Sequence, residues 1–516
     1  MPEAPEPSPA YNLGSWPARR AAWAPDRLAV VDDRHRLSFA GFEERVARTA
    51  GLLVGHGVEP GDRVALLLAN HSGYLEAVFA AARLGAIAMP INARLAAPEV
   101  AWLLRDSGPR LLLVESDLAD LGRRAAAELA DPPRLLAVGG DPDSFEARLA
   151  EADPIAHSEP ARPDDAALLL YTSGTTGRPK GALLPQRKAL YNALNAQLFF
   201  DLRSTDRVLV PVPLFHSFGL KILSLPAFYA GASVHLMRRF DADEVWRTVE
   251  AEGITTLGGV PTMFRRLLES LDRSPRRDTS SLRFLFTAGA PVPVELIRAF
   301  EARGLVLKQG FGQTETSILC CLDAWDAVRK AGSVGRPVFH AEVRVVRRED
   351  LAGPPSGWRD VEPGEPGEIV VRGPITMLGY WRQPAATAET LREGGWLLTG
   401  DLATVDEEGF LWLVGRAREI YISGGENVAP AEVEAALGLH PAVAEVAVIG
   451  VPDPEWGEAG RAFVVLRPGA RASARELRRF AEERLARFKI PREFRFVESL
   501  PRTVTGKVQK HRLPRD

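Results

Sequence analysis

Residues 171–181, YTSGTTGRPKG, combine hydroxyls, glycines and two basic side chains in a pattern that suits phosphate. Main-chain N–H groups around the glycines and the side-chain hydroxyls can donate to several phosphate oxygens together, and a lysine adds positive charge. The run is not a Walker A loop, which requires G-x-x-x-x-G-K-[ST]. So many donors directly after a buried strand favour a phosphate loop over an ordinary surface turn. The predicted contacts are Thr172, Ser173, Gly174, Thr175, Thr176, Gly177 and Lys180.

A second candidate group is GFGQTET, residues 310–316, which follows the predicted strand LVLKQ. Its glycines would let the backbone pass close to a flat ring, and Glu315 offers a hard carboxylate suited to Mg²⁺ beside phosphates. A plain strand–turn–helix is the alternative. TAGAP, residues 287–291, ends another strand, and ligands bind at the carboxyl ends of parallel strands, so both loops are expected to line one crevice. The predicted nucleotide contacts here are Gly289, Ala290, Gly310, Phe311, Gly312 and Thr314.

Three charged side chains in the last quarter of the chain extend this set. Asp401, in TGD, would accept hydrogen bonds from both hydroxyls of a ribose, although a lone aspartate is more often a turn residue. Arg416 would brace the same sugar. Lys507, in PRTVTGKVQK, is predicted to lie in a glycine turn at the end of a folded domain, which favours a chemical task over a solvated tail.

Short strand-like runs alternate with longer helical ones from about residue 164, and the first 110 residues alternate in the same way. AALLLYT, residues 166–172, is predicted as a strand that leads into the phosphate loop, and residues 242–252 are predicted as a helix. Strands bounded by helices over this length indicate mostly parallel sheets covered by helices. Residues 340–415 are richer in strands and turns, which indicates a β-rich subdomain.

The character of the sequence changes again beyond the β-rich subdomain. Pro430 stands where a first helical turn would begin, and a later helix would open with Ser473 and Glu476 in capping-box spacing. About 100 residues with their own helices and strands suffice for a small α+β domain. We therefore predict an α/β fold, with a large N-terminal domain that includes the β-rich subdomain and a small C-terminal one. The predicted domains are 1–417 and 418–516.

Composition narrows the functional class. With 46% hydrophobic and 25% charged residues, the 516-residue chain is typical of a globular protein with at least two domains. A net charge of −3 provides no general attraction for nucleic acid, so no nucleic-acid partner is expected. The adjacent cysteines, Cys320 and Cys321, would close no useful loop, and no apolar run is long enough to span a bilayer. The start of the chain lacks the features of a secretory signal, so a cytoplasmic location is expected.

Taken together, these segments resemble the adenylate-forming superfamily, which includes acyl-CoA synthetases, firefly luciferase and the adenylation domains of peptide synthetases. The resemblance covers nearly the whole chain, with the motifs in the family's order and spacing. Within the superfamily the chain looks most like bacterial fatty-acyl-CoA synthetases of the mycobacterial type, on the phrases INARLAAPEVAWLLRDSG, WDAVRKAGSVGRP and SGGENVAPAEVE. The motifs that match are YTSGTTGRPKG, PLFHSFG, GFGQTE, WLLTGD, GRAREIYISGGENV and TVTGK.

The resemblance implies a two-step reaction with ATP, Mg²⁺ and CoA. A carboxylate would attack the α-phosphate of ATP to give acyl-AMP and pyrophosphate, and the CoA thiol would then displace AMP. Lys507 would span the reacting groups, while Glu315 with Mg²⁺ and the loop from Thr172 to Lys180 would handle pyrophosphate. The C-terminal domain would next rotate about a hinge at Arg418, where the family usually has Asp or Lys. The rotation would bring a CoA-facing loop to the site: Ser423, Gly424 and Gly425.

The acyl side of the site is predicted from the same resemblance. His216, in PLFHSFG, would form a gate between an acyl tunnel and the adenylate, and this is preferred to a role as a core histidine. Small and aliphatic residues dominate, so a medium- or long-chain fatty acid is expected, with an aryl acid as the alternative. Lys221 is expected to reach solvent; if it points inward, a dicarboxylic acid becomes the alternative. The predicted lining is His216, Phe218, Gly219, Leu220, Gly258, Gly259, Ala288 and Ile318.

Several alternatives stay open at this point. A carrier-loading adenylation enzyme would share the first step, a luciferase-like oxygenase would share the fold, and an inactive nucleotide-binding regulator would have damaged motifs. Residues 265–277 carry five arginines beside leucines. Solvated surface is the favoured interpretation of this segment, and weak peripheral contact with anionic lipid at the inner membrane face is the alternative. Trp456 is interpreted as structural, with CoA contact as the alternative.

Overall fold

The computed structural model describes residues 6–138, 142–172, 179–274, 276–290, 292–417, 419–423, 426–454, 456–485, 487–503 and 506–516. The chain divides into two compact units. The first unit comprises Met1–Glu342 and Val371–Leu391, and the second comprises Val343–Val370 and Arg392–Asp516. The predicted α/β fold is confirmed, including the β-rich region and the small α+β region near the C-terminus. The predicted domain boundary at 417/418 stays a prediction.

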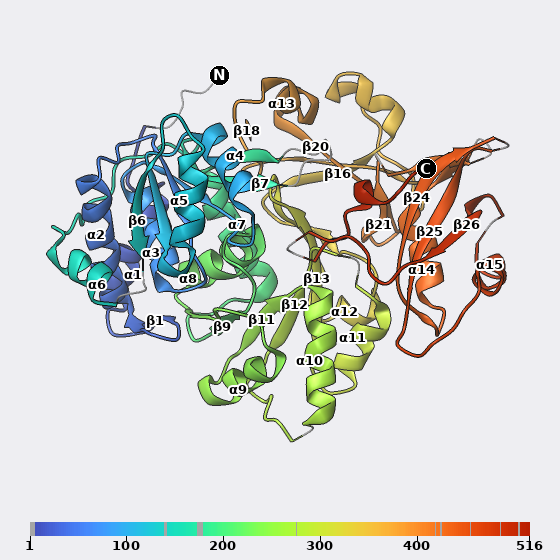
Figure 1. Cartoon of the computed structure of the whole chain (residues 1–516), viewed down its shortest axis with the longest axis horizontal. Coiled ribbons are helices and arrows are strands. Elements are labelled where there is room, and N and C mark those ends of the chain that lie inside the picture. The colour runs from blue at the N-terminus through green and yellow to red at the C-terminus, as the bar shows by residue number, and fades with distance from the viewer. Residues whose placement is uncertain are drawn as a thin grey trace. The chain divides into compact units, whose positions relative to one another are not determined.

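The first unit contains a sheet with the strand order β18–β8–β7–β4–β3–β5–β6 (Figure 1). The strands from β7 to β6 pair in parallel, whereas β8 is antiparallel to both β7 and β18. Strand β5, LLLVE, is buried along its whole length, as parallel strands covered on both faces usually are. The strands are β18 (Gly379–Tyr380), β8 (Lys180–Pro185), β7 (Ala166–Thr172), β4 (Ile87–Pro90), β3 (Arg63–Leu67), β5 (Leu111–Glu115) and β6 (Arg134–Val138).

A second sheet of the same unit has the order β15–β14–β13–β12–β11–β9–β10–β1–β2. Its strands pair in parallel from β13 to β1, while β14, β15 and β2 are antiparallel additions at the two edges. Carboxyl ends of the parallel strands therefore meet at one edge, which is where ligands bind in such sheets. The strands are β15 (Arg336–Pro337), β14 (Ser317–Cys321), β13 (Leu307–Gln313), β12 (Phe284–Thr287), β11 (Thr256–Gly259), β9 (Arg207–Val210), β10 (Ser233–Leu236), β1 (Leu28–Val31) and β2 (Arg36–Ser38).

Helices cover these sheets. Helix α9 occupies the predicted residues, and its Asp241 N-cap accepts a hydrogen bond from Glu244 N at 2.8 Å. Trp246 of α9 and Phe264 of α10 are fully buried in one core with Leu285 of β12. The helices are α1 (Trp16–Trp23), α2 (Phe39–Gly55), α3 (Ser72–Arg83), α4 (Ala97–Ser107), α5 (Ala119–Ala127), α6 (Pro142–Glu151), α7 (Gln186–Phe200), the π-helical segment η3 (Phe218–Ser224), α8 (Leu225–Ala230), α9 (Ala242–Glu252), α10 (Pro261–Arg273), α11 (Val294–Glu301), α12 (Asp326–Arg329) and α13 (Pro384–Thr390).

Helix α10 carries most of the arginine-rich segment 265–277. Arg273 lies 3.5 Å from Asp243, and Arg277 lies 3.4 Å from Glu250, so acidic residues of α9 partly neutralise it. Among the described residues, none forms a helix with both the length and the apolar character needed to cross a bilayer. Lipid contact through this segment stays a prediction.

The second unit holds most of a β-rich sheet with the order β16–β17–β20–β19, in which β21 also pairs with β20. It also holds the sheet β23–β22–β25–β24, with β26 beside β25. The predicted capping box is confirmed, because Ser473 Oγ accepts from Glu476 N and Glu476 Oε2 accepts from Ser473 N. The elements are β16 (Glu342–Val346), β17 (Gly367–Arg372), β20 (Trp396–Val405), β19 (Leu391–Arg392), β21 (Leu411–Arg416), β22 (Tyr421–Ser423), β23 (Glu426–Val428), β24 (Val443–Asp453), β25 (Gly457–Leu466), β26 (Glu493–Phe496), α14 (Pro430–Gly438) and α15 (Ala474–Glu482).

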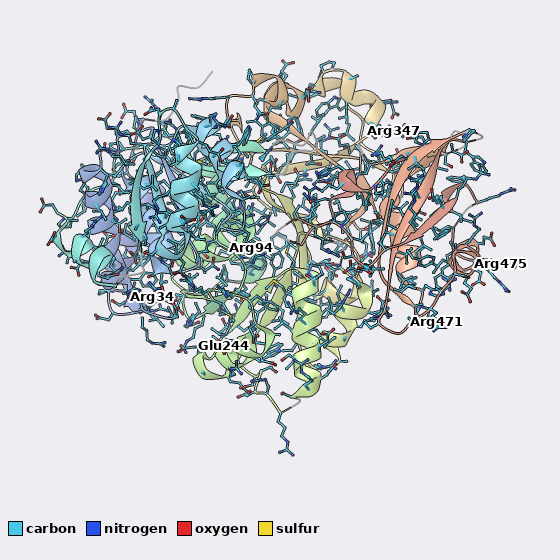
Figure 2. The ribbon with its side chains drawn as sticks, viewed as in Figure 1. Arg34, Arg94, Glu244, Arg347, Arg471 and Arg475 are labelled. Atoms are coloured by element: carbon cyan, nitrogen blue, oxygen red, sulfur yellow. The ribbon has the colours of Figure 1, made fainter. Side chains whose placement is uncertain are left out.

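Both faces of the β24–β25 pair are covered. Helices α14 and α15 bury Val433 and Leu477 on one face, and the C-terminal segment places Leu500 and Leu513 against Phe463 on the other. The segment between these two leucines is therefore anchored at both ends on the sheet. Figure 2 shows labelled charged side chains, among them Arg34, Glu244 and Arg475, extending outward from the ribbon, as expected for a globular composition.

Candidate functional site

The predicted phosphate loop is the connection of a β-hairpin. Thr172 ends β7, Lys180 begins β8, and the two residues face each other in the antiparallel ladder. Thr172 Oγ1 lies 3.3 Å from the Lys180 carbonyl oxygen, which fixes the two ends of the loop together. The structure therefore confirms the strand that leads into the loop. The remaining predicted contacts lie outside the described residues: Ser173, Gly174, Thr175, Thr176 and Gly177.

Glu315 stands at the tip of a second hairpin. The residues GFGQ continue strand β13, and the chain then turns back into β14 rather than entering a helix. Ser317, which follows the turn, has a φ of 63°, a left-handed conformation that is uncommon outside glycine. A Cβ at Gly312 would lie 1.9 Å from the Ser317 carbonyl oxygen, so this turn requires glycine at 312. The hairpin thus directs Thr314 and Glu315 away from the sheet edge.

The Glu315 carboxylate meets side chains from two other segments. Its Oε1 accepts a hydrogen bond from the Tyr380 hydroxyl at 3.1 Å and lies 3.4 Å from Thr172 Oγ1. The Lys180 ammonium lies 5.0 Å from the centre of the Tyr380 ring, within cation–π range. We call Thr172, Lys180, Glu315 and Tyr380 the Glu315 cluster. The structure therefore brings three predicted residues together: Thr172, Lys180 and Glu315.

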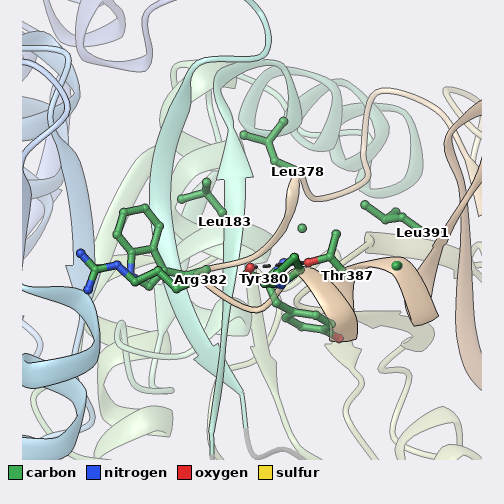
Figure 3. Close-up of a pocket in the computed structure, with 10 residues that line it drawn as sticks. Leu183, Leu378, Tyr380, Arg382, Thr387 and Leu391 are labelled. Carbon is green, nitrogen blue, oxygen red and sulfur yellow. Dashed lines mark hydrogen bonds between the residues drawn. The ribbon is translucent and has the colours of Figure 1, made fainter.

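Tyr380 was missed by the sequence reasoning. It sits in the two-residue strand β18, which pairs with β8 and places Tyr380 opposite Ala182. Its amide donates to Thr387 Oγ1 at 2.9 Å, as Figure 3 shows. The short aromatic run GYW, at residues 379–381 in a turn-rich region, is the one signal that would have drawn attention to it.

A pocket of about 400 Å³ lies beside Tyr380 (Figure 3). Its walls come from β8, β18 and α13 and are mainly apolar, with Leu183, Leu378 and Leu391 among them. No predicted site residue lines this pocket among the described residues. This pocket is therefore not the predicted crevice.

The Glu315 cluster has a donor set suited to Mg²⁺. Magnesium prefers oxygen ligands and is commonly held by one or two carboxylates together with substrate phosphates. Glu315 supplies one carboxylate, and Thr172 supplies a neighbouring hydroxyl. Within the described ranges, no group of three or more His, Cys, Asp or Glu side chains forms a metal cage. These residues fit a metal that is shared with a nucleotide, and Mg²⁺ binding stays a proposal.

The predicted acyl residues lie on several adjoining elements. Phe218 of η3 packs edge-on against Phe286 of β12 at 5.7 Å between ring centres, and Gly258 faces Phe286 in the sheet register. A Cβ at Gly258 would lie 2.7 Å from Leu223, and one at Gly310 would lie 3.0 Å from Phe286. These contacts make a wall of aromatic rings and glycines. Gly219, Leu220, Gly259 and Ile318 are buried nearby in the fold, Ala288 is half-buried, and Gly289 and Ala290 are exposed.

His216, the predicted gate, is exposed at the start of the same region. Its Nδ1 accepts a hydrogen bond from Phe218 N at 3.2 Å, so the pyridine-type nitrogen of the neutral ring faces the backbone. This contact fixes the imidazole against η3. The gate role stays a prediction.

Lys221 corrects an expectation, because it is buried rather than directed to solvent. It is 3% exposed, since η3 packs against α7 and β14, and its Nζ donates to the Thr314 carbonyl at 3.2 Å. Burial lowers the pKa of Lys221 to about 7, against the opposing effect of the Glu315 carboxylate. Lys188 of α7 is also fully buried and donates to the Glu315 carbonyl at 2.8 Å and to the Ile375 carbonyl. Burial lowers the pKa of Lys188 well below its ordinary value.

Asp401 and Arg416, which lie in the second unit, are also brought together. They are partners in the antiparallel β20–β21 ladder, and Arg416 Nε lies 3.0 Å from Asp401 Oδ1. Asp401 is only 6% exposed, and its amide donates to Thr399 Oγ1 at 3.1 Å. The carboxylate is therefore held by a charged partner, and the ribose-binding role of Asp401 stays a prediction.

Lys507 lies on an exposed turn in the C-terminal segment. The Thr503 amide donates to the Lys507 carbonyl at 2.7 Å, and the Lys507 amide donates to Thr503 Oγ1 at 3.0 Å. Gly506 has a φ of 87°, which only glycine adopts readily, so the predicted glycine turn is confirmed. Three residues later, the ammonium of the half-buried Lys510 lies 3.0 Å from Glu419 and 2.8 Å from Glu434, which ties the segment to its domain.

The predicted CoA-facing loop is only partly described. Ser423 is buried at the end of β22, opposite Gly457 of β25. Gly424, Gly425 and the predicted hinge Arg418 lie outside the described residues. Trp456 is half-buried, with the Arg492 guanidinium 5.7 Å from its ring centre, which is consistent with the structural interpretation.

Comparison with known proteins identifies the family. Residues 17–381 match the family model for the AMP-binding enzymes, and residues 432–507 match that for the AMP-binding enzyme C-terminal domain. A feruloyl-CoA synthase of an Amycolatopsis species is 44% identical over 98% of this chain and 99% of that protein. The indoleacetate–CoA ligase of Aromatoleum aromaticum is 41% identical, and the long-chain-fatty-acid–CoA ligase FadD13 of Mycobacterium tuberculosis is 36% identical, each over 97% of both chains.

Comparison with solved structures also finds enzymes that are similar to this chain along nearly its whole length. ATP-bound MatB from Rhodopseudomonas palustris superposes with a TM-score of 0.88 at 31% identity, over 97% of both chains. The anthranilate CoA ligase AuaEII in complex with anthranoyl-AMP also has a TM-score of 0.88, at 30% identity, over 97% of this chain and 96% of that one.

These findings correct one part of the sequence interpretation. The similarity to the mycobacterial fatty-acid ligase is real, but it is weaker than the similarity to the feruloyl-CoA synthase. The reaction class is shared by all these relatives: an acid is joined to CoA at the expense of ATP, with AMP as a product. The chain belongs to the AMP-binding enzymes of the adenylate-forming superfamily, as an ATP-dependent acid–CoA ligase.

Proposed function

We propose that this ligase activates an aromatic carboxylic acid, of the arylpropenoate or arylacetate type, as its CoA thioester. The observation that carries the proposal is the 44% identity to a feruloyl-CoA synthase along almost the entire length of both proteins. The indoleacetate–CoA ligase, at 41%, points to the same substrate class, and the fatty-acid ligase at 36% is less similar. An aryl acid was the alternative at the sequence level, and it now becomes the main proposal.

The first step forms a bond between a carboxylate oxygen and the α-phosphorus of ATP, and pyrophosphate leaves. Both reactants are anions, so positive charge must lie between them in the transition state. Lys507 would supply it as an ammonium on a flexible stem, because its turn exposes the side chain to incoming reactants. Lys180 and Thr172 would contact the departing phosphates, and Asp401 would accept from the ribose hydroxyls. Mg²⁺ held by Glu315 would supply further charge neutralisation on the phosphates.

The second step forms the carbon–sulfur bond of the thioester, as the CoA sulfur attacks the acyl-AMP carbonyl and AMP leaves with the electron pair. Lys507 has no further task there and would obstruct the thiol. A rotation of the C-terminal domain about Arg418 would remove it and bring the loop at Ser423 to the site. In that arrangement, Gly424 and Gly425 would leave room for the pantetheine arm.

The acyl wall supports a flat substrate. Phe218 and Phe286 are already arranged edge to face, and an aromatic ring packs well against such edges. Gly258 and Gly310 have no side chains, and Leu223 and Phe286 fill the space beside them, so the wall is closely packed. A medium- or long-chain fatty acid is the second candidate, and the similarity to FadD13 supports it. A dicarboxylic acid has less support from Lys221, because its ammonium is directed to the Thr314 carbonyl.

The test is a substrate panel with purified protein, ATP, Mg²⁺ and CoA. Ferulate, indoleacetate, benzoate, 2-succinylbenzoate, octanoate and palmitate are compared by AMP release and by mass-spectrometric detection of each thioester. We expect kcat/KM for the best aryl acid to exceed that for the best fatty acid by at least about tenfold, which equals about 1.4 kcal/mol. A preference for palmitate or octanoate would overturn the substrate proposal. If the protein exchanges pyrophosphate into ATP in the presence of an acid but forms no CoA thioester, a carrier-loading adenylation enzyme would be favoured instead.

A further inference from the structure

Two buried lysines contact adjacent carbonyl groups of the Glu315 hairpin. Lys188, on α7, donates to the Glu315 carbonyl, and Lys221, on η3, donates to the Thr314 carbonyl. The two lysines are 33 positions apart in the sequence, and their side chains converge on the peptide that carries the carboxylate. Neither contact was expected from the sequence. Lys188 belongs to none of the sequence motifs described above.

The burial of both ammonium groups calls for an explanation. Moving an ammonium group out of water is costly unless it is paired or well hydrogen-bonded. Lys188 is 0% exposed and Lys221 is 3% exposed, yet the hydrogen-bond partners of their amines among the described residues are main-chain carbonyls, not carboxylates. If these positions served only to stabilise the core, apolar side chains would be expected there, because they avoid the cost of removing an amine from water. The two amines are therefore retained for the hydrogen bonds that they donate to the backbone at residues 314–315.

The surrounding contacts leave the two side chains little freedom. Both line a cavity of about 10 Å³, which has room for no more than one water. Asn192 of α7 connects η3 to strand β14 of the hairpin. Its Nδ2 donates to the Lys221 carbonyl at 2.6 Å, and its Oδ1 accepts from Ile318 N at 3.4 Å. The Glu315 carbonyl also accepts from Met377 N at 2.8 Å. Helix α7, η3 and the hairpin are thus locked to one another at residues 314–315.

We propose that Lys188 and Lys221 are positioning residues for Glu315, whose hydrogen bonds hold the peptide at 314–315 so that the carboxylate faces Thr172 and Tyr380. This inference rests on the proposed function in one respect, namely that Mg·ATP is the ligand of the Glu315 cluster. It does not depend on which acid is activated. Because the lysines act through the backbone, they touch neither the acid nor the nucleotide.

The experiment compares four variants of the full chain. K188M and K221M remove the amine and its hydrogen bond, while K221Q keeps a hydrogen-bond donor at the position. K308M is the matched control: Lys308 is 6% exposed and donates to the Phe199 carbonyl at 2.8 Å, but it has no contact with residues 314–315. Binding of Mg·ATP and of adenosine is measured by isothermal titration calorimetry, ATP KM and kcat by steady-state kinetics, and stability by urea unfolding.

We expect K188M and K221M to weaken Mg·ATP binding by about 10- to 100-fold, the usual loss when a residue that orients a metal ligand is removed. Adenosine, which lacks phosphates, should bind all variants alike. K221Q should fall between K221M and the wild type, and K308M should bind Mg·ATP within about twofold of the wild type, because it changes a comparable buried amine elsewhere. The loss should be larger in ATP KM than in kcat.

The proposal is overturned if K221M and K188M bind Mg·ATP as tightly as K308M, or if adenosine affinity falls in parallel. Should K188M fail to fold, K221M and K221Q still decide the matter. The thioester assay on the wild type separates this inference from the proposed function. A wild type that binds Mg·ATP but makes no aryl thioester refutes the substrate, whereas unaltered Mg·ATP binding in an active K221M enzyme refutes the positioning role.

Discussion

The Glu315 cluster and the Lys507 turn place their charged groups in opposite ways. Around Glu315, the carboxylate accepts from Tyr380, lies beside Thr172, and has its backbone held by two buried amines. Lys507 instead stands exposed on a glycine turn, where its backbone is hydrogen-bonded to Thr503. One region is fixed before any ligand arrives, and the other presents a long side chain to solvent.

This difference matches two different tasks. A group that binds Mg·ATP gains from a fixed geometry, because no ordering cost is then incurred on binding. A group that must reach two reactants and later leave needs a flexible stem and a surface position. We therefore expect substitutions in the Glu315 cluster to alter nucleotide binding, and substitutions at the turn to alter the rate of adenylate formation with little change in stability.

The largest effect is expected for K507A. Adenylate formation should slow by about 10²- to 10³-fold, since one charged donor to the transition state is removed. The free energy of unfolding should stay within about 0.5 kcal/mol of the wild type, as for most exposed positions. Single-turnover formation of acyl-AMP measures the first quantity, and urea unfolding measures the second. Conversion of synthetic acyl-AMP to thioester serves as the control and should continue; adenylate formation at the wild-type rate would remove Lys507 from the mechanism.

The second effect is expected for E315Q, which keeps the shape of the side chain and removes its charge. A contact with a charged group is worth about 1.5–3 kcal/mol, which corresponds to about 10- to 100-fold in Mg·ATP affinity. Calorimetric titration should show this loss, together with a higher Mg²⁺ concentration for half-maximal activity. Equal Mg²⁺ requirements in E315Q and the wild type would mean that the cluster does not hold the metal.

A smaller effect is expected for Y380F, which removes the hydrogen bond to Glu315 and keeps the ring beside Lys180. A single hydrogen bond contributes about 0.5–1.5 kcal/mol, so ATP KM should rise by about two- to tenfold with kcat nearly unchanged. A higher ATP KM without a change in kcat indicates an effect on ATP binding rather than on the chemical step. A fall in kcat alone would show that the cluster acts in the transition state and would weaken the contrast with Lys507.

The smallest effect is expected for T503A at the turn. It removes the hydrogen bond from the Lys507 amide to Thr503 Oγ1 and leaves the Lys507 side chain in place. Loss of a partly exposed hydrogen bond should slow adenylate formation by about two- to fivefold through a looser turn. ATP affinity should not change, which makes T503A the counterpart of Y380F. A change confined to ATP affinity would contradict the separation of the two regions.

Much of the candidate site could be predicted from local sequence. Strand β7 and helix α9 were predicted at the residues they occupy, because buried apolar runs and caps are local signals. The glycine turn before Lys507 and the pairing of Asp401 with Arg416 on neighbouring strands were also consistent with the predicted roles. These features depend on short segments whose residue types restrict the backbone directly.

Other features could not be predicted in this way. Lys221 was assigned to solvent because a charged residue on a helical segment is usually exposed, and its burial depends on how η3 packs against α7. Tyr380 reaches Glu315 only because β18 pairs with β8. Lys188 has no motif of its own, and its role follows from the hairpin that folds over it. Each of these contacts joins segments that are distant in the chain.

The sequence alone determined the motif order, the α/β class and the chemical groups available: a hydroxyl-rich loop, a carboxylate in a glycine-rich turn, and an amine on a glycine turn near the C-terminus. These are properties of short segments, in which glycine, proline and hydrophobic period restrict the local backbone. The tertiary structure alone decided which amines are buried and which aromatic hydroxyl reaches Glu315. Such contacts form when distant elements pack, and the cost of desolvating a charge then depends on neighbours that no local pattern specifies.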